Sequence, residues 1–173
     1  MTVTAAAVAL EVSSDRTHTA VVMASQLEDD DRVMLELVAW LDGSTAGVGE
    51  VLRLRRELPE RVLRAVVVDP LSPAATLIQP LQEAGVELVE PATRDAAVAG
   101  GWFLDWFNSK QLWFRDPHPA LAAAMREVDL KSLAGAQTLD RRNPVVAPAV
   151  AAMWALWAVL SVPEEPEVQI FVG

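Results

Sequence analysis

Two acidic residues, Glu11 and Asp69, have the types and positions that chemistry requires. Glu11 lies inside the apolar run Val8–Ser14, and Asp69 directly follows the apolar run Arg64–Val68. A carboxylate in an apolar strand is costly unless it reaches solvent, pairs with a base or binds a cation. Taken singly, Glu11 is read most simply as a solvent-facing residue of an alternating strand. Asp69 is equally compatible with a turn cap and with a ligand at the carboxyl end of a strand.

Taken together, the two acids predict a metal site. If their strands are parallel neighbours, about 4.8 Å apart, both carboxylates can share one cation or two closely spaced cations. Metals held in this way activate a water molecule and stabilise the leaving oxygen of a phosphodiester. Hard oxygen ligands suit Mg²⁺ or Mn²⁺. The pair therefore indicates metal-assisted phosphodiester hydrolysis. Asp15 is a further possible ligand, although ordinary turn chemistry is the preferred interpretation.

The elements that must position these acids begin with three short β-type runs. Apolar patterns separated by turn-like residues cover Val8–Ser14, Thr19–Ser25 and Val33–Trp40. Three consecutive strands with short connections predict an antiparallel meander. A helical pattern follows at Glu50–Leu58, and Arg64–Val68 then has the composition of a buried parallel strand.

The rest of the chain alternates helices with short strands. Ser72 and Pro73 have the types expected at the start of a helix. The expected segments are a helix at Ser72–Ala84, a strand at Val86–Val89, a helix from Thr93 to Phe107, and a helix from Pro117 or Pro119 to Val128. This βββ-α-β-α-β-α order predicts an α/β fold with an RNase H-like mixed sheet flanked by helices. We expect one domain over residues 1–162 and an acidic tail over residues 163–173, with a last possible strand at Val168–Val172.

Composition narrows the classes of function. The 173 residues include no cysteine, which excludes thiolate metal sites and cysteine nucleophiles. The net charge of −10 does not supply the basic surface of a protein that holds nucleic acid by phosphate contacts alone. Contact with DNA would need metal ions, local basic patches or a partner domain. The basic cluster between Arg53 and Arg64 is interleaved with acids and is interpreted as a solvated helix face.

The stretch Val145–Val162 is uncharged and long enough to span a membrane. Its many alanines and the position of Pro148 favour a buried core helix, with a membrane span as the alternative. The amino terminus lacks the basic region of a secretory signal, so none is expected.

Several segments in order resemble one known family. The most specific is the DP-x-x-PA motif that begins at Asp69, and the next is the D-R-R motif followed by P-x-V-A-A within Asp140–Ala152. With the segments around Glu11 and before Leu121, they resemble the C-terminal RNase H-like nuclease domain of phage terminase large subunits over roughly Val8 to Leu160.

The resemblance implies a metal-dependent endonuclease that cuts double-stranded DNA during viral genome packaging, in the cytoplasm of the infected bacterial host. It implies Mg²⁺ or Mn²⁺ as cofactor and, as partners, the ATPase motor domain, the small terminase subunit and the portal, with no membrane. The implied catalytic and metal-binding residues are Glu11 and Asp69, with Asp140 as the third.

Two departures from the family pattern weaken that expectation. The first acid of the family is normally aspartate, where this chain has Glu11, and the place of the last acid is taken by Val145 or Val146. Asp140 is the nearest upstream substitute, but it could instead pair with Arg141 or Arg142. The alternative function is therefore a catalytically degenerate RNase H-like module that docks to the portal, the capsid or the packaging motor.

The two histidines and the aromatic residues are given structural interpretations. His18 and His118 fall in different elements, so a histidine metal site is not expected, and His118 precedes a helix that it could open. The aromatic residues between Trp102 and Phe114 are spaced for packing rather than for stacking on bases.

Overall fold

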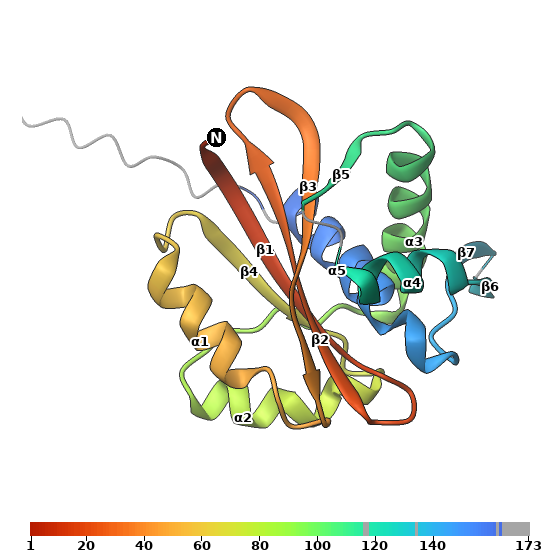
Figure 1. Ribbon diagram of the computed structural model, residues 1–173, viewed down its shortest axis with the longest axis horizontal. Coiled ribbons are helices and arrows are strands. Elements are labelled where there is room, and N and C mark those ends of the chain that lie inside the picture. Colours follow the sequence, from red (N-terminus) through yellow and green to blue (C-terminus); the bar gives the residue numbers. More distant parts are fainter. Residues whose placement is uncertain (116–117, 134, 162, 164–173) are drawn as a thin grey trace, which may run out of the picture.

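The computed structural model describes residues 1–115, 118–133, 135–161 and 163. Its centre is a five-stranded sheet in the order β4-β1-β2-β3-β5 (Figure 1). The strands are β1 (Val3–Val12), β2 (His18–Leu27), β3 (Asp30–Asp42), β4 (Leu63–Val68) and β5 (Leu112–Phe114). β1, β2 and β3 pair antiparallel, whereas β4 joins β1 and β5 joins β3 in parallel. The predicted meander and the mixed sheet are both confirmed.

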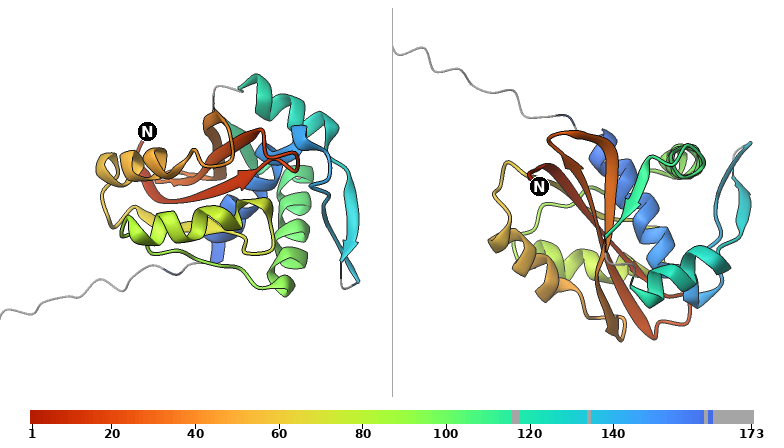
Figure 2. Two further views of the ribbon diagram at one scale, coloured as in Figure 1. Left: turned by 90° about the horizontal axis from the view of Figure 1, so that it is seen from below. Right: turned by 45° about the horizontal axis from the view of Figure 1, so that its top comes forward.

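Helices cover both faces of this sheet (Figures 1 and 2). One face carries α1 (Val48–Glu57), the 3₁₀ turn η1 (Pro73–Leu77) and α2 (Ile78–Glu83). The other carries α3 (Thr93–Asn108), α4 (Pro119–Glu127), the 3₁₀ turn η2 (Pro144–Val146) and α5 (Ala147–Ser161). A separate hairpin of β6 (Leu130–Leu133) and β7 (Ala136–Leu139) packs against α3.

The alternation of β1 divides its side chains between two cores. Ala5, Ala7 and Ala9 belong to the core on the α5 face. Val8 and Leu10 belong to the core beneath α1 and α2. The small alanine side chains leave room for α5 to lie close to the sheet, and α5 packs against both β1 and β2.

The apolar helix α5 is the centre of the core on its face. Every residue from Ala149 to Leu156 is at most 1% exposed, because the sheet, α3 and α4 surround the helix. By length and composition Pro144–Ser161 could cross a membrane, but 78% of that stretch is buried inside the structure. Its apolar surface is thus explained by core packing. Val162, the last residue of the predicted stretch, lies outside the described residues.

Some helix boundaries differ from the sequence expectation. Ser72 caps its helix as predicted, accepting a hydrogen bond from the Ala74 amide at 3.0 Å, but the first turn is 3₁₀. Thr93, whose residue type favours the N-cap position, is instead the first helical residue of α3, because the Asp95 carboxylate accepts the Ala92 amide and closes the turn one residue earlier.

The start of α4 agrees with the sequence expectation, whereas the short strands differ from it. α4 begins at Pro119, and His118 Nδ1 accepts the Ala120 amide at 3.1 Å, which confirms the helix-opening role of this histidine. The expected strand Val86–Val89 is reduced to one bridge to β4. The β6–β7 hairpin was not predicted, since its short, polar segments carry little apolar alternation. The possible strand Val168–Val172 lies outside the described residues.

Gly100 and Gly101 in α3 provide a matched test of the contact between α3 and the hairpin. A Cβ at Gly100 would lie 2.5 Å from the Gln137 carbonyl oxygen, whereas a Cβ at Gly101 meets nothing within 4 Å. We expect Gly100→Ala to lower the free energy of unfolding by roughly 1–3 kcal/mol through overpacking. Gly101→Ala should instead raise it by about 0.5–1 kcal/mol through helix propensity. Urea unfolding of both variants measures this, and equal effects would contradict the close contact.

Candidate functional site

Glu11 and Asp69 are brought together by the parallel pairing of β1 and β4. Leu10 lies opposite Val68 in this ladder, so each acid follows one member of the same pair. Glu11 is 1% exposed and Asp69 is 6% exposed. The solvent-facing interpretation of Glu11 is therefore wrong, because alternation turns it to the α5 face. Asp69 also makes the turn contact considered above, with Oδ1 accepting the Leu71 amide at 2.9 Å.

A third charged side chain, Arg141, joins the two acids. It comes from the segment between β7 and α5 and donates from Nη2 to Asp69 Oδ2 at 2.7 Å. Its Nη1 lies 3.9 Å from Glu11 Oε2. The Arg141 side chain is 21% exposed, which makes it the most accessible of the three. The guanidinium is thus the positive charge beside both carboxylates.

The charges in this cluster are only partly satisfied. Both carboxylate oxygens of Glu11, and Nε and Nη1 of Arg141, are buried without a partner at hydrogen-bond geometry among the described residues. Burial raises the pKa of Glu11 from its ordinary value of 4.5 to about 7. The positive charge of Arg141 lowers this pKa, and the negative charge of Asp69 raises it. Ser72 and the Val12 backbone also lower it. Two acids with one guanidinium therefore form a site that is short of positive charge.

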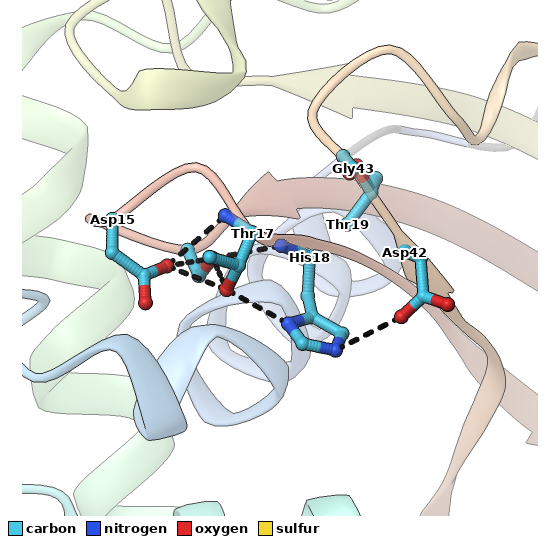
Figure 3. Close-up of polar contacts among 7 residues, drawn as sticks. Asp15, Thr17, His18, Thr19, Asp42 and Gly43 are labelled. Atoms are coloured by element: carbon cyan, nitrogen blue, oxygen red, sulfur yellow. Dashed lines mark hydrogen bonds and ion pairs between the residues drawn. The ribbon is translucent and has the colours of Figure 1, made fainter.

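The turn between β1 and β2 is built on Asp15 (Figure 3). One oxygen of Asp15 accepts hydrogen bonds from Ser13 Oγ at 2.7 Å, Thr17 Oγ1 at 2.8 Å and the Thr17 amide at 3.0 Å. These bonds, from Ser13 first and then Thr17, lower the pKa of the Asp15 carboxyl. The geometry agrees with the turn interpretation of Asp15.

His18, the first residue of β2, is held by its neighbours in the same region. Its Nδ1 lies 2.8 Å from Thr17 Oγ1 and its Nε2 lies 3.2 Å from Asp42 Oδ1 (Figure 3). The ring stacks on Trp40 with centroids 4.6 Å apart. Both ring nitrogens therefore have partners, one in the β1–β2 turn and one in β3, as expected of a structural histidine.

The same turn also connects the segments that carry the site. Arg16, in the left-handed conformation with φ 62°, donates to the Pro73 carbonyl and to Thr76 Oγ1, both at 3.0 Å. Ser14 Oγ donates to the Arg142 carbonyl at 2.7 Å. The turn after Glu11 is thereby fixed to η1, which follows Asp69, and to the residue after Arg141.

Asp140 lies in a different environment from the two other predicted ligands. Its carboxylate accepts the Arg142 amide at 3.0 Å and Arg142 Nε at 2.7 Å, and it is also paired with Nη2. Hydrogen bonds from Arg142 lower the pKa of Asp140. Asp140 lines a shallow pocket with Glu127 and Asp129. The pairing with Arg142 that the sequence left open is therefore present.

No group of three acidic or histidine side chains in the described part of the chain is arranged to hold one metal ion. At the place of the missing family acid, Val146 is fully buried and Val145 is 42% exposed, and neither offers an oxygen ligand. The role of Asp140 as third ligand stays a prediction.

Sequence reasoning missed the position of Arg141. From the sequence, the arginines of the D-R-R motif are expected only as partners of Asp140. The available signal is physical: two carboxylates predicted to lie on neighbouring strands favour a positive charge beside them, and this basic pair precedes the core helix.

Comparison with solved structures identifies the fold. The chain superposes on the large terminase of bacteriophage HK97 with a TM-score of 0.68 and 14% identity, over 91% of this chain and 40% of that chain. The large terminase of a thermophilic bacteriophage, solved in complex with ADP, superposes with a TM-score of 0.66 and 12% identity. The match covers 94% of this chain and 40% of that chain. The large terminase nuclease of the thermophilic phage G20c superposes with a TM-score of 0.52 and 14% identity, over 85% of this chain and 80% of that chain.

These similarities confirm the RNase H-like α/β fold and its resemblance to the terminase nuclease. The chain spans 40% of the length of the two large terminases. No protein-family model and no curated protein sequence matches the chain.

The raised pKa of Glu11 predicts a specific pH dependence of stability. Between pH 4.5 and about 7 the unfolded chain releases this proton while the folded chain retains it, so stability falls as pH rises through that window and levels off above it. The contribution is roughly 3 kcal/mol in full. Glu11→Gln stays neutral, so it should become more stable than the wild type as pH increases from 5 to 8 in urea unfolding.

Glu87→Gln provides the matched control, because Glu87 is an exposed glutamate that is not a member of the cluster. This variant should keep the pH dependence of the wild type. If the free energy of unfolding of the wild type and of Glu11→Gln had the same pH dependence, the raised pKa of a buried Glu11 would be contradicted.

Proposed function

We propose that this chain is a terminase-type nuclease module that hydrolyses double-stranded DNA, with Glu11 and Asp69 as the ligands of a divalent cation. The observation that carries the proposal is the pair of buried carboxylates on adjoining parallel strands, one of which has both oxygens without a hydrogen-bond partner among the residues described. The similarity of the fold to large terminases supports it.

The donor set fits one hard divalent cation. Within the described ranges neither Glu11 oxygen has a hydrogen-bond partner, and Asp69 Oδ2 accepts a hydrogen bond from the side chain of Arg141. Carboxylate oxygens are the ligands that Mg²⁺ and Mn²⁺ prefer. A cation held here would supply Lewis-acid polarisation of the phosphate and of the attacking water. The protein contributes the fixed spacing of the two carboxylates and a backbone anchored by the β1–β2 turn.

Binding of DNA requires positive charge from beyond the acid pair. The chain carries a net charge of −10, while Arg142, beside the site, has a side chain that is 88% exposed. Phosphate contacts of this kind position DNA without reading its sequence. In this proposal, further contacts come from an ATPase motor domain, a small terminase subunit and the portal, in the cytoplasm of an infected bacterium.

A plasmid-nicking assay with Mg²⁺ and then Mn²⁺ tests the proposal. We expect metal-dependent cleavage by the wild type and a loss of at least about 100-fold in Asp69→Asn and Glu11→Gln, because each variant removes a charged ligand. Asparagine keeps an oxygen for the Leu71 amide, so the turn after β4 is preserved.

Two variants make the assay specific. Glu87→Gln, at an exposed position, should cleave at the wild-type rate. Asp140→Asn tests the third predicted ligand: full activity would remove Asp140 from the site, and loss of activity would add it. Absence of metal-dependent cleavage by folded wild-type protein would reject the nuclease.

The second candidate is a catalytically degenerate module that docks to the portal, the capsid or the packaging motor. The specific observation in its favour is that a guanidinium already binds Asp69, while valines stand where the last acid of the family lies. In that case Arg141 is a permanent counter-ion, and neither metal produces cleavage by the wild type.

A further inference from the structure

Arg141 occupies the place at which a cation would meet both acids. It is bonded to Asp69 Oδ2 at 2.7 Å and lies 3.9 Å from Glu11 Oε2, beyond hydrogen-bond distance. A guanidinium that satisfied both carboxylates would bond each of them, but this one bonds only Asp69. Two of its own nitrogens, Nε and Nη1, are buried without a hydrogen-bond partner in the described part of the chain.

Among the described residues, the Glu11 carboxylate and the Arg141 guanidinium have few alternative partners. Neither Glu11 oxygen has a hydrogen-bond partner among the residues that the structure describes, and Arg142 is held by Asp140 rather than by this pair. An unpaired buried polar group is costly, and an unpaired buried charge is more so. In this arrangement one guanidinium therefore offsets two carboxylates, whose oxygens could accept further hydrogen bonds or coordinate a cation.

From this geometry we propose that Arg141 is a built-in competitor of the metal: the guanidinium and a divalent cation bind the Glu11–Asp69 pair mutually exclusively. This inference rests on the proposed metal site and adds its regulation. When no metal is bound, Arg141 stabilises the buried acids. A divalent cation must displace the guanidinium from Asp69, so part of its binding free energy is consumed in breaking that ion pair.

The side chain is suited to such an exchange. At 21% exposure, Arg141 is connected to solvent, whereas Glu11 is enclosed. Its long, flexible stem can carry the charged end into water without moving the backbone. The backbone itself stays fixed, because Ser14 holds the carbonyl of the next residue.

The decisive experiment is direct Mn²⁺ binding, measured from the loss of the free-Mn²⁺ electron paramagnetic resonance signal. We expect Arg141→Gln to bind Mn²⁺ about tenfold or more tightly than the wild type, because the competitor is gone. Its thermal midpoint should be lower than that of the wild type without metal and should rise more when Mn²⁺ is added. Equal affinities of the two proteins would overturn the proposal.

Arg56→Gln is the matched control, since it removes an exposed arginine of α1, on the opposite face of the sheet. It should bind Mn²⁺ as the wild type does. The double variant Glu11→Gln/Arg141→Gln should lose the gain, because one of the two charged ligands is absent. A gain that survives in the double variant would place the metal elsewhere and overturn the proposal.

Arg141→Lys guards against a failure of Arg141→Gln to fold. Lysine keeps the positive charge but presents a compact ammonium instead of a planar fork, so it binds the carboxylate less specifically. We expect its Mn²⁺ affinity to lie above that of the wild type. An affinity equal to or below that of the wild type would contradict competition by the guanidinium.

Nicking assays on the same proteins separate this inference from the proposed function. Tighter Mn²⁺ binding by Arg141→Gln without any cleavage would support the competition and reject the nuclease. Cleavage by the wild type with no change of Mn²⁺ affinity in Arg141→Gln would support the nuclease and reject the competition.

Discussion

The burial of two carboxylates on adjacent strands is the constraint on which this structure depends. Glu11 and Asp69 lie on the same face because β1 and β4 are parallel and their ladder places Leu10 opposite Val68. Two negative groups in a largely buried position require a positive group near them. The segment between β7 and α5 supplies Arg141, whose guanidinium bonds Asp69 and lies beside Glu11.

Packing and electrostatics are connected through β1. The alanines on one side of β1 let α5 lie close to the sheet, and the same alternation carries Glu11 to that side. A larger residue in place of Ala9 would push α5 outward. Since Arg141 shortly precedes the 3₁₀ turn that leads into α5, such a change would also separate the guanidinium from Asp69.

The order of the main strands and helices could be predicted from the sequence because each carries a strong local pattern. The pairing of the acids was also predictable, as Arg64–Val68 reads as a buried parallel strand that ends at Asp69. The β6–β7 hairpin was not, because its strands are short and polar and depend on a contact at Gly100 of α3. The bond between Arg141 and Asp69 joins residues far apart in the chain, and no spacing rule connects them. The choice between Arg141 and Arg142 as the partner of Asp140 is likewise set by tertiary structure.

The position of α5 late in the chain has a consequence for how the protein is made. β1, β2 and β3 precede α5 in the chain, so the alanine-lined face of their meander lacks the cover of α5 until that helix has been synthesised. Contacts between such distant segments form slowly, and exposed apolar strands are prone to associate with one another. Until α5 packs against it, this face is therefore exposed to association with other apolar segments, and the packing of α5 removes that exposure.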